Sequence, residues 1–299
     1  MSAFRGAPVA LRPGAGVLRR SETLEVLGRA CRLRRTQLGL ALFGLIAAIA
    51  IFGPLLAPKS STAFVAIPYS PPSGAAPFGT DALGRDVLSR FLAGGHTLLL
   101  DSLLAAIVGV GGGALVGLAA AYGRGALDTV LMRISDVLLA FPQIVLVLLA
   151  VSTVGPKASL IILMVGLSHL PRTARVIRGA ALEVVERDFV KAAEACGERR
   201  WRILTADLLP NVSGPLLVEA GLRFTYSIAL IAAIAFLGFG PQPPSPDWGL
   251  MINENRIGIT AQPWAVVLPI IAIALLTVGA NLATDGIART VSGIDRGSR

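Results

Sequence analysis

The chain has 299 residues, of which 54% are hydrophobic and only 15% charged, and its mean hydropathy is +0.71. Soluble domains carry roughly 25% charged residues, so the composition excludes a disordered chain and disfavours an ordinary soluble enzyme. A net charge of +9 could serve nucleic acid binding in a soluble protein, whereas in a membrane protein it more often marks cytoplasmic loops. Two Cys and two His are too few for a disulfide scaffold and leave little for a metal site.

A helix that crosses the lipid needs about 20 apolar residues, and the sequence offers six candidate stretches. In chain order they are residues 38–57, 102–122, 137–155, 158–171, 224–239 and 264–283. The fourth is short unless Arg172 and Arg175 snorkel, and the fifth can extend back towards Gly214 across Glu219 and Arg223. We therefore predict an all-α integral membrane protein with about six transmembrane helices.

The basic residues test this count. With a cytoplasmic N-terminus, the inside segments hold 21 Lys and Arg residues and the outside segments five. Because this bias follows the positive-inside rule, the charge is mostly topological, and we expect no nucleic acid partner. The expected organisation is a basic cytoplasmic segment at 1–37, a first transmembrane helix and outside loop at 38–96, a core of five transmembrane helices at 97–286 and a cytoplasmic tail at 287–299.

The N-terminal segment has two interpretations. We expect no cleavable signal, because the first apolar run starts at Leu38 and is too long for a signal core. Residues 21–37 combine apolar residues at helical spacing with several arginines, which suits an amphipathic helix on the inner leaflet. A basic tail that only sets orientation fits equally well.

Small residues mark the second span, and prolines mark the third and the last. Gly109, Gly113 and Gly117 recur every four residues, which permits close approach of a neighbouring helix. Pro142 and Pro269 should kink or locally open their helices. Plain kinks are the preferred interpretation, and a gate is the alternative.

No sequence motif for catalysis is present. The chain lacks the G-x-x-x-x-G-K-[ST] phosphate loop, G-x-S-x-G, H-E-x-x-H and any paired Cys motif. Ionisable residues inside the membrane are then the default functional candidates. They are Asp101, His169, Glu219 and Arg223, and the spacing of Glu219 and Arg223 predicts an ion pair on one helix face.

The inside loop at 172–213 should be folded, because loops of this length tend to be functional. Apolar residues recur at helical spacing from Leu182 to Cys196, and Gly197 follows where a helix would stop. A second short stripe, Trp201, Leu204 and Leu208, ends at Pro210. We expect a helix–Gly–helix hairpin whose apolar stripe either needs a partner groove or packs on its own bundle.

The hairpin also resembles a known element. The run from Phe189 to Gly197, with Ile203 and the sequence Leu208-Leu209-Pro210-Asn211, resembles the E-A-A-x-x-x-G…I-x-x-x-x-L-P loop. That loop belongs to permease subunits of binding-protein-dependent ABC importers, in which it couples to the ATPase. The resemblance implies coupling roles for Lys191, Ala192, Ala193, Glu194, Gly197, Trp201, Leu209 and Pro210. One departure is Lys191, which stands where the family usually has Glu.

Three further stretches narrow the family to dipeptide, oligopeptide and nickel permeases. The run from Phe78 to Arg90 resembles their first outside loop, with motif residues Gly79, Thr80, Asp81, Gly84, Arg85 and Asp86. Residues 237–249 resemble the loop before their last span, and residues 281–289 resemble the end of that span. The order of the stretches and the long N-terminal section favour the C-type subunit.

The resemblance implies a type I ABC importer permease in the plasma membrane of a prokaryote, with both termini cytoplasmic. This chain would supply half of the pathway, beside a homologous second permease, two ATPase subunits and an extracytoplasmic solute-binding protein. ATP and Mg would bind to the ATPase partners, so we expect no cofactor in this chain and no enzymatic activity of its own. Peptides are the expected cargo, and nickel or another small solute is the alternative.

Two other classes of protein fit the sequence less well. A stand-alone secondary carrier would need no ATPase, but it usually shows more acidic residues in mid-membrane and a repeated half. An integral membrane enzyme would need a nucleophile or metal constellation that the sequence does not offer.

Overall fold

The computed structural model describes residues 28, 30–31 and 33–292 of the protein. Its long helices are α2 (Arg34–Leu56), α4 (Gly95–Gly123), α5 (Gly125–Leu139), α6 (Gln143–Val154), α7 (Ala158–Val185), α11 (Ser213–Phe236) and α13 (Trp264–Ser292). Shorter elements are α3 (Val87–Ala93), α8 (Asp188–Ala195), α9 (Arg200–Arg202), the π-helical turn η1 (Ile203–Leu208), α10 (Leu209–Asn211), α12 (Trp248–Asn255) and the 3₁₀ turn η2 (Arg256–Gly258). Within the described residues the only β pairing is two isolated bridges.

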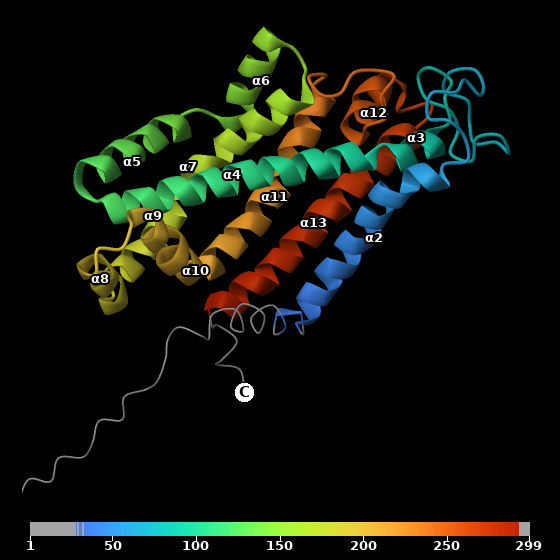
Figure 1. Ribbon diagram of the computed structural model, residues 1–299. Helices are drawn as coiled ribbons and strands as arrows, with labels where there is room; N and C mark the ends of the chain where they lie inside the picture. Colours follow the sequence, from blue (N-terminus) through green and yellow to red (C-terminus); the bar gives the residue numbers. More distant parts are fainter. Residues whose placement is uncertain (1–27, 29, 32, 293–299) are drawn as a thin grey trace, which may run out of the picture.

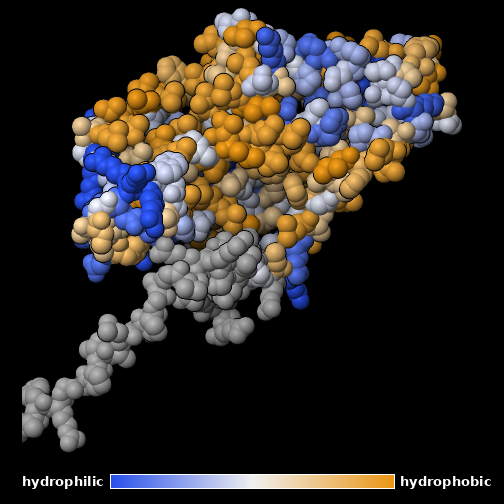
Figure 2. All heavy atoms as spheres, viewed as in Figure 1, coloured by the Kyte–Doolittle hydropathy of each residue, from blue (hydrophilic) through white to orange (hydrophobic). Residues whose placement is uncertain are grey.

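Five helical segments are long and apolar enough to cross a membrane, and a sixth is counted if the bent pair α5–α6 is one span. The expected all-α fold with about six spans is therefore confirmed. Figure 2 shows a broad hydrophobic surface across the middle of the molecule, with hydrophilic residues gathered towards both ends. Large apolar side chains such as Leu45, Ile107 and Leu149 are exposed, as lipid-facing residues should be.

The most extensive helix contact in the described part of the chain is between α4 and α7, which overlap in Figure 1. A Cβ on Gly113 would lie 2.5 Å from the Cβ of Thr173, and one on Gly117 would lie 2.5 Å from the carbonyl oxygen of Ala174. Because only hydrogen fits there, the glycine stripe lets the two backbones touch. The predicted packing role of Gly109, Gly113 and Gly117 thus has a specific partner helix.

The third expected span, 137–155, is not one helix. α5 ends at Leu139, α6 begins at Gln143, and their axes differ by 81°. Pro142 has no N–H to donate to the carbonyl of Leu138 and disfavours helical geometry at Phe141, so the helix breaks there. Two ion pairs then hold α5 along α7: Arg178 contacts Asp128 at 2.5 Å, and Arg175 contacts Asp136.

The fourth span is longer than expected. We predicted residues 158–171 as the span and a loop from Arg172, but α7 continues to Val185 through Pro171. The apolar stripe of Ala174, Ile177 and Ala181 continues past the proline and is fully buried, while Arg172 stays exposed. Burial of this stripe against α4 extends the helix by about four turns.

Both ends of the chain differ in detail from the expected ranges. α2 begins at Arg34, inside the range 1–37, and α13 continues to Ser292, inside the range 287–299. Before α2 the structure describes only residues 28, 30–31 and 33, and it describes nothing after 292, so most of the interfacial helix suggested for 21–37 lies outside the described residues.

Candidate functional site

The hairpin comprises α8 to α10, residues 188–211, at the end of the molecule where α2 begins and α13 ends (Figure 1). Gly197 has φ +73°, the left-handed conformation that its position predicted. Its N–H donates to Glu194 O at 3.0 Å, and the N–H of Glu198 donates to Ala193 O at 3.1 Å. These two bonds form a Schellman motif, which ends α8 and turns the chain.

The second arm of the hairpin differs from expectation at Pro210. The sequence suggested that Pro210 ends the helix, but the helical run continues from Arg200 to Asn211 through the π turn η1. The N–H of Leu209 donates to Leu204 O, which shifts the hydrogen-bond register just before the proline. A π turn inserts one residue and so accommodates a ring that has no N–H to donate.

One face of the hairpin packs on its own bundle. Val190, Ile203 and Leu208 are fully buried in a cluster with apolar residues of α4 and α7, and Ala193 packs against the same cluster. Of the two alternatives for the predicted apolar stripe, packing on the bundle therefore holds for Ala193 and Leu208.

Other residues of the hairpin are exposed in the isolated chain. Ala192, Glu194 and Cys196 are exposed, and Trp201 is 64% exposed although it is the largest side chain of the hairpin. Trp201 borders an apolar cavity of about 570 Å³ between α4 and the second arm. Large exposed aromatic side chains of this kind are typical anchors for a partner protein.

Lys191, the departure from the family motif, pairs within the chain. Its Nζ lies 3.4 Å from Glu186 Oε2, and Glu186 Oε1 accepts from Arg124 at 2.7 Å. All three side chains are more than half exposed, so these pairs contribute little to stability. The charge at this position is thus directed towards the end of α7.

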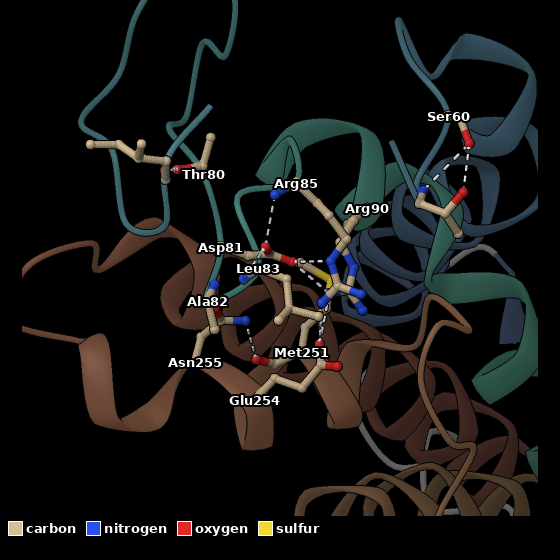
Figure 3. A network of polar contacts seen from close by, with 12 residues as sticks. Ser60, Thr80, Asp81, Ala82, Leu83, Arg85, Arg90, Met251, Glu254 and Asn255 are labelled. Carbon is tan, nitrogen blue, oxygen red and sulfur yellow. Dashed lines mark hydrogen bonds and ion pairs between the residues drawn. The ribbon is translucent and has the colours of Figure 1, made fainter. Parts of the chain in front are cut away.

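At the opposite end of the molecule, the outside-loop motif forms what we call the loop anchor: Asp81, Arg85, Arg90, Glu254 and Asn255 (Figure 3). Asp81 Oδ2 accepts from Arg85 Nε at 2.7 Å and from Arg90 Nη1 at 2.6 Å. Glu254 Oε2 accepts from the same two arginines at 2.9 and 2.6 Å. Asn255 Oδ1 accepts from the N–H of Ala82 at 2.9 Å, so the loop is joined to α12.

The remaining motif residues shape the loop around this anchor. Gly79 and Gly84 have φ near +75°, and a Cβ on Gly84 would lie 2.1 Å from Ala66 O. Thr80 Oγ1 accepts from Ser70 N and donates to Ile67 O, each at 2.8 Å. Asp86 caps α3, because its Oδ2 accepts from the N–H of Ser89 at 3.0 Å.

The loop anchor is largely buried, so the cost of burying its charged groups opposes the attraction between them. Arg90 is fully buried, and its Nε and Nη2 have no hydrogen-bond partner among the described residues. Burial raises the pKa of Glu254 from 4.5 to about 7; Arg85 opposes this shift and Asp81 adds to it. The anchor is therefore a structural site whose charge changes near neutral pH.

The polar residues expected inside the membrane divide into two groups. Glu219 Oε2 accepts from Arg223 Nε at 3.0 Å and from Thr173 Oγ1 at 3.2 Å, so the predicted ion pair is present and buried. His169 Nε2 lies 3.1 Å from Ser227 Oγ on the same two helices. Asp101 is separate, near Asp247 and His96 at the anchor end of α4.

Sequence reasoning missed the partners that complete these sites. Glu254 and Asn255 lie on a short helix more than 160 residues from the loop they hold. Arg90 lies within the motif stretch, but nothing local marked it as buried. Among the described residues no three His, Cys, Asp or Glu side chains come together as a metal site.

Comparison with known proteins places the chain in a family. Residues 113–293 match the family described as the binding-protein-dependent transport system inner membrane component, and this stretch includes the hairpin, α12 and α13. The chain belongs to this family. The match of the inner membrane component to more than half of the chain, with its apolar helices, identifies a multi-pass membrane protein.

Relatives of this inner membrane component have similar lengths. The di/tripeptide transport system permease protein DppC of Pseudomonas aeruginosa is 36% identical over 256 residues, which are 83% of this chain and 84% of that protein. DppC of Alkalihalophilus pseudofirmus, a dipeptide permease, is 35% identical over 80% of this chain and 79% of its own. The glutathione permease GsiD of Pectobacterium atrosepticum is 36% identical over 72% of each chain.

A solved structure supports the fold of the inner membrane component. The MetNI methionine ABC transporter, in inward-facing conformations, aligns with a TM-score of 0.51 over 69% of this chain and 96% of that chain. At 21% identity the likeness concerns the fold alone. The type I permease architecture expected from the sequence agrees with it.

Proposed function

We propose that this chain is the membrane-spanning subunit of an ATP-driven importer and forms half of the translocation pathway for short peptides. The observation that carries the proposal is that relatives about 36% identical over most of the chain are named as permeases for dipeptides, tripeptides and glutathione. All three cargoes are small peptides, which favours this class over nickel.

In this proposal the hairpin couples the subunit to an ATPase. Exposed hairpin residues such as Ala192 and Trp201 meet the partner, while Val190, Ile203 and Leu208 fix the hairpin to α4 and α7. Closure of an ATPase dimer on ATP and Mg would then move the hairpin and these two helices together. The chain itself supplies no ATP site.

The proposed assembly has two permease subunits, two ATPase subunits and a solute-binding protein in the inner membrane of a prokaryote. The start of α2, the end of α13 and the hairpin lie at one end of the molecule (Figure 1). These segments carry Arg34, Arg35, Arg199, Arg200, Arg202 and Arg289, so we assign this end to the cytoplasm by the positive-inside rule. The loop anchor then faces the solute-binding protein.

Reconstitution tests this function. The chain is co-expressed with the second permease and the ATPases encoded beside it, purified, and placed in lipid vesicles with the solute-binding protein. We expect ATP-dependent uptake of labelled dipeptide or tripeptide, and no uptake from vesicles that lack this chain. Uptake by this chain alone without ATP would instead indicate a secondary carrier, and ATP-dependent uptake of nickel without peptide would indicate the other cargo.

A further inference from the structure

A cationic cavity lies between the first turn of α2 and the last turns of α13, at the end of the molecule that carries the hairpin (Figure 1). Its volume is about 320 Å³, and its lining is Leu33, Arg34, Arg35, Asp285, Gly286 and Arg289. No contact of the loop anchor, the hairpin or the buried ion pair involves these residues, so the sites described above do not account for the cavity.

The two helices meet here through close backbone contact. A Cβ on Gly39 would lie 2.6 Å from Ala283 N, and one on Gly286 would lie 1.8 Å from Thr36 Oγ1. Thr36 is buried, and its hydroxyl has no hydrogen-bond partner among the described residues. Such tight packing fixes the relative positions of the two helices from which the arginines of the cavity extend.

The charge of the cavity is unusual for a helix start. Three guanidinium groups and one carboxylate give it a formal charge of +2. Arg34 and Arg35 occupy the first turn of α2, which contains no acidic residue, and Leu33 provides no side-chain cap. Basic side chains at a helix N-terminus oppose the helix dipole, and a bound anion would relieve this repulsion.

The face of α2 that follows Arg34 is apolar and exposed. Leu38, Leu45 and Phe52 follow Arg34 on the same face of α2, at spacings of 4, 7 and 7 residues, and are 62%, 59% and 57% exposed. This stripe begins where the arginines end, so the cavity lies at the level where lipid headgroups meet the hydrocarbon. A molecule that fits both features has an anionic head and long apolar tails.

We propose that the cavity binds the phosphate headgroup of an anionic phospholipid, whose acyl chains lie along the exposed stripe of α2. Guanidinium groups suit this role because they donate paired hydrogen bonds to phosphate oxygens. Asp285 supplies an acceptor beside them, which favours a headgroup that carries one phosphate charge and hydroxyl donors, such as phosphatidylglycerol. Basic pockets between membrane helices on the cytoplasmic side are typical sites for such headgroups.

The test uses the full chain with whatever subunits co-purify, in nanodiscs of phosphatidylcholine with or without phosphatidylglycerol. Retained phosphatidylglycerol is counted by native mass spectrometry, and thermal stability is measured in parallel. Arg34→Gln, Arg35→Gln and Arg289→Gln should each weaken retention by about fivefold. Arg256→Gln, an exposed arginine at the opposite end of the molecule, is the matched control and should leave retention unchanged.

Two further experiments distinguish lipid binding from loss of folding and from binding of free phosphate. The variant with Arg34→Lys and Arg35→Lys keeps the charge but loses the paired donors, and should retain an intermediate amount of lipid if it elutes as a folded protein. Soluble inorganic phosphate should not reproduce the stabilisation. Equal retention by wild type and the Gln variants would overturn the proposal, as would full stabilisation by phosphate alone or no retention because a partner subunit covers the site.

Discussion

Glu219 and Arg223 form an ion pair inside a membrane-spanning helix, and each reduces the cost of burying the other. Both side chains are 7% exposed, and Thr173 adds a hydroxyl donor to the carboxylate. Removing one partner leaves an uncompensated charge in a medium of low dielectric, whereas removing both does not. Single substitutions should therefore be more harmful than the pair.

A double-mutant cycle measures this coupling. We expect Glu219→Ala and Arg223→Ala each to lower the stability and folded yield markedly, and the double variant to lose less than their sum by about 1–3 kcal/mol. Thermal stability in detergent and folded yield by size-exclusion chromatography are measured for wild type, the two single variants and the double variant. Strictly additive losses would show that the two side chains act separately.

The loop anchor predicts a pH dependence through Glu254. Its pKa is about 7 in the folded protein against an ordinary value of 4.5, so the folded state holds a proton that the unfolded chain releases between these values. The stability contributed by this proton is complete below about pH 4.5 and is lost as the pH rises through about 7. Glu254→Gln fixes the neutral form and should remove this part of the dependence.

Thermal midpoints of wild type and Glu254→Gln at about pH 5 and about pH 8 check the sign. The wild-type midpoint should fall further than that of the variant as the pH rises. A larger fall in the variant would mean that the carboxylate, held by Arg85 and Arg90, is the stable form and that these two ion pairs outweigh the cost of burial.

At the scale of elements, the glycine stripe of α4 offers a matched pair of substitutions. Gly113→Ala places a methyl group 2.5 Å from the Cβ of Thr173, whereas Gly111→Ala meets no atom within 4 Å. Overpacking should cost Gly113→Ala about 1–3 kcal/mol, while Gly111→Ala should gain a few tenths to 1 kcal/mol from helix propensity. Equal thermal midpoints for the two variants would refute close packing of α4 on α7.

Substitutions in the hairpin can test its proposed role in coupling separately from its role in folding. Gly197→Val forces a β-branched residue to φ +73°, and Ala192→Glu adds a charge to the exposed face, so both should reduce retained ATPase and peptide uptake while membrane insertion stays normal. Ala193→Glu instead points into the buried cluster and should lower stability as well. Retained ATPase, stimulated hydrolysis and vesicle uptake are measured for each variant.

Wild-type values of all three in Gly197→Val and Ala192→Glu would mean that the hairpin is not the coupling element. A loss of membrane insertion in Ala192→Glu would mean that this face is part of the fold rather than a docking surface.

These elements also show which features local sequence can predict. The Schellman turn at Gly197 and the pair Glu219–Arg223 depend on residues within five positions, and both were predictable. The extension of α7 past Pro171 depends on burial against α4, which periodicity near a proline does not reveal. The π turn lets the helix continue through Pro210, where local sequence suggested that it would end. Glu254 joins Arg90 across 164 residues, and no local pattern specifies such a partner.

For the whole molecule, the proposed topology places Cys31 and Cys196 in the cytoplasm, where thiols stay reduced. Both are free and exposed, so they report sidedness directly. In right-side-out spheroplasts a membrane-impermeant maleimide should label neither, and lysis should make both reactive. Ser60→Cys, in the exposed loop after α2, is the positive control and should react before lysis. Labelling of Cys196 in intact spheroplasts would invert the topology.

The close packing of α4 against α7 affects how the two helices can move. At 1.5 Å per residue, the 29 residues of α4 extend about 44 Å, from beside the loop anchor to the hairpin. Because backbone touches backbone along the glycine stripe, few flexible side chains lie between the two helices to absorb a displacement. The two helices should therefore move as one rigid body, and a tilt of the pair by about 5° about one end would displace the other end by about 4 Å. A displacement on one side of the membrane would therefore reach the other side with few residues changing conformation.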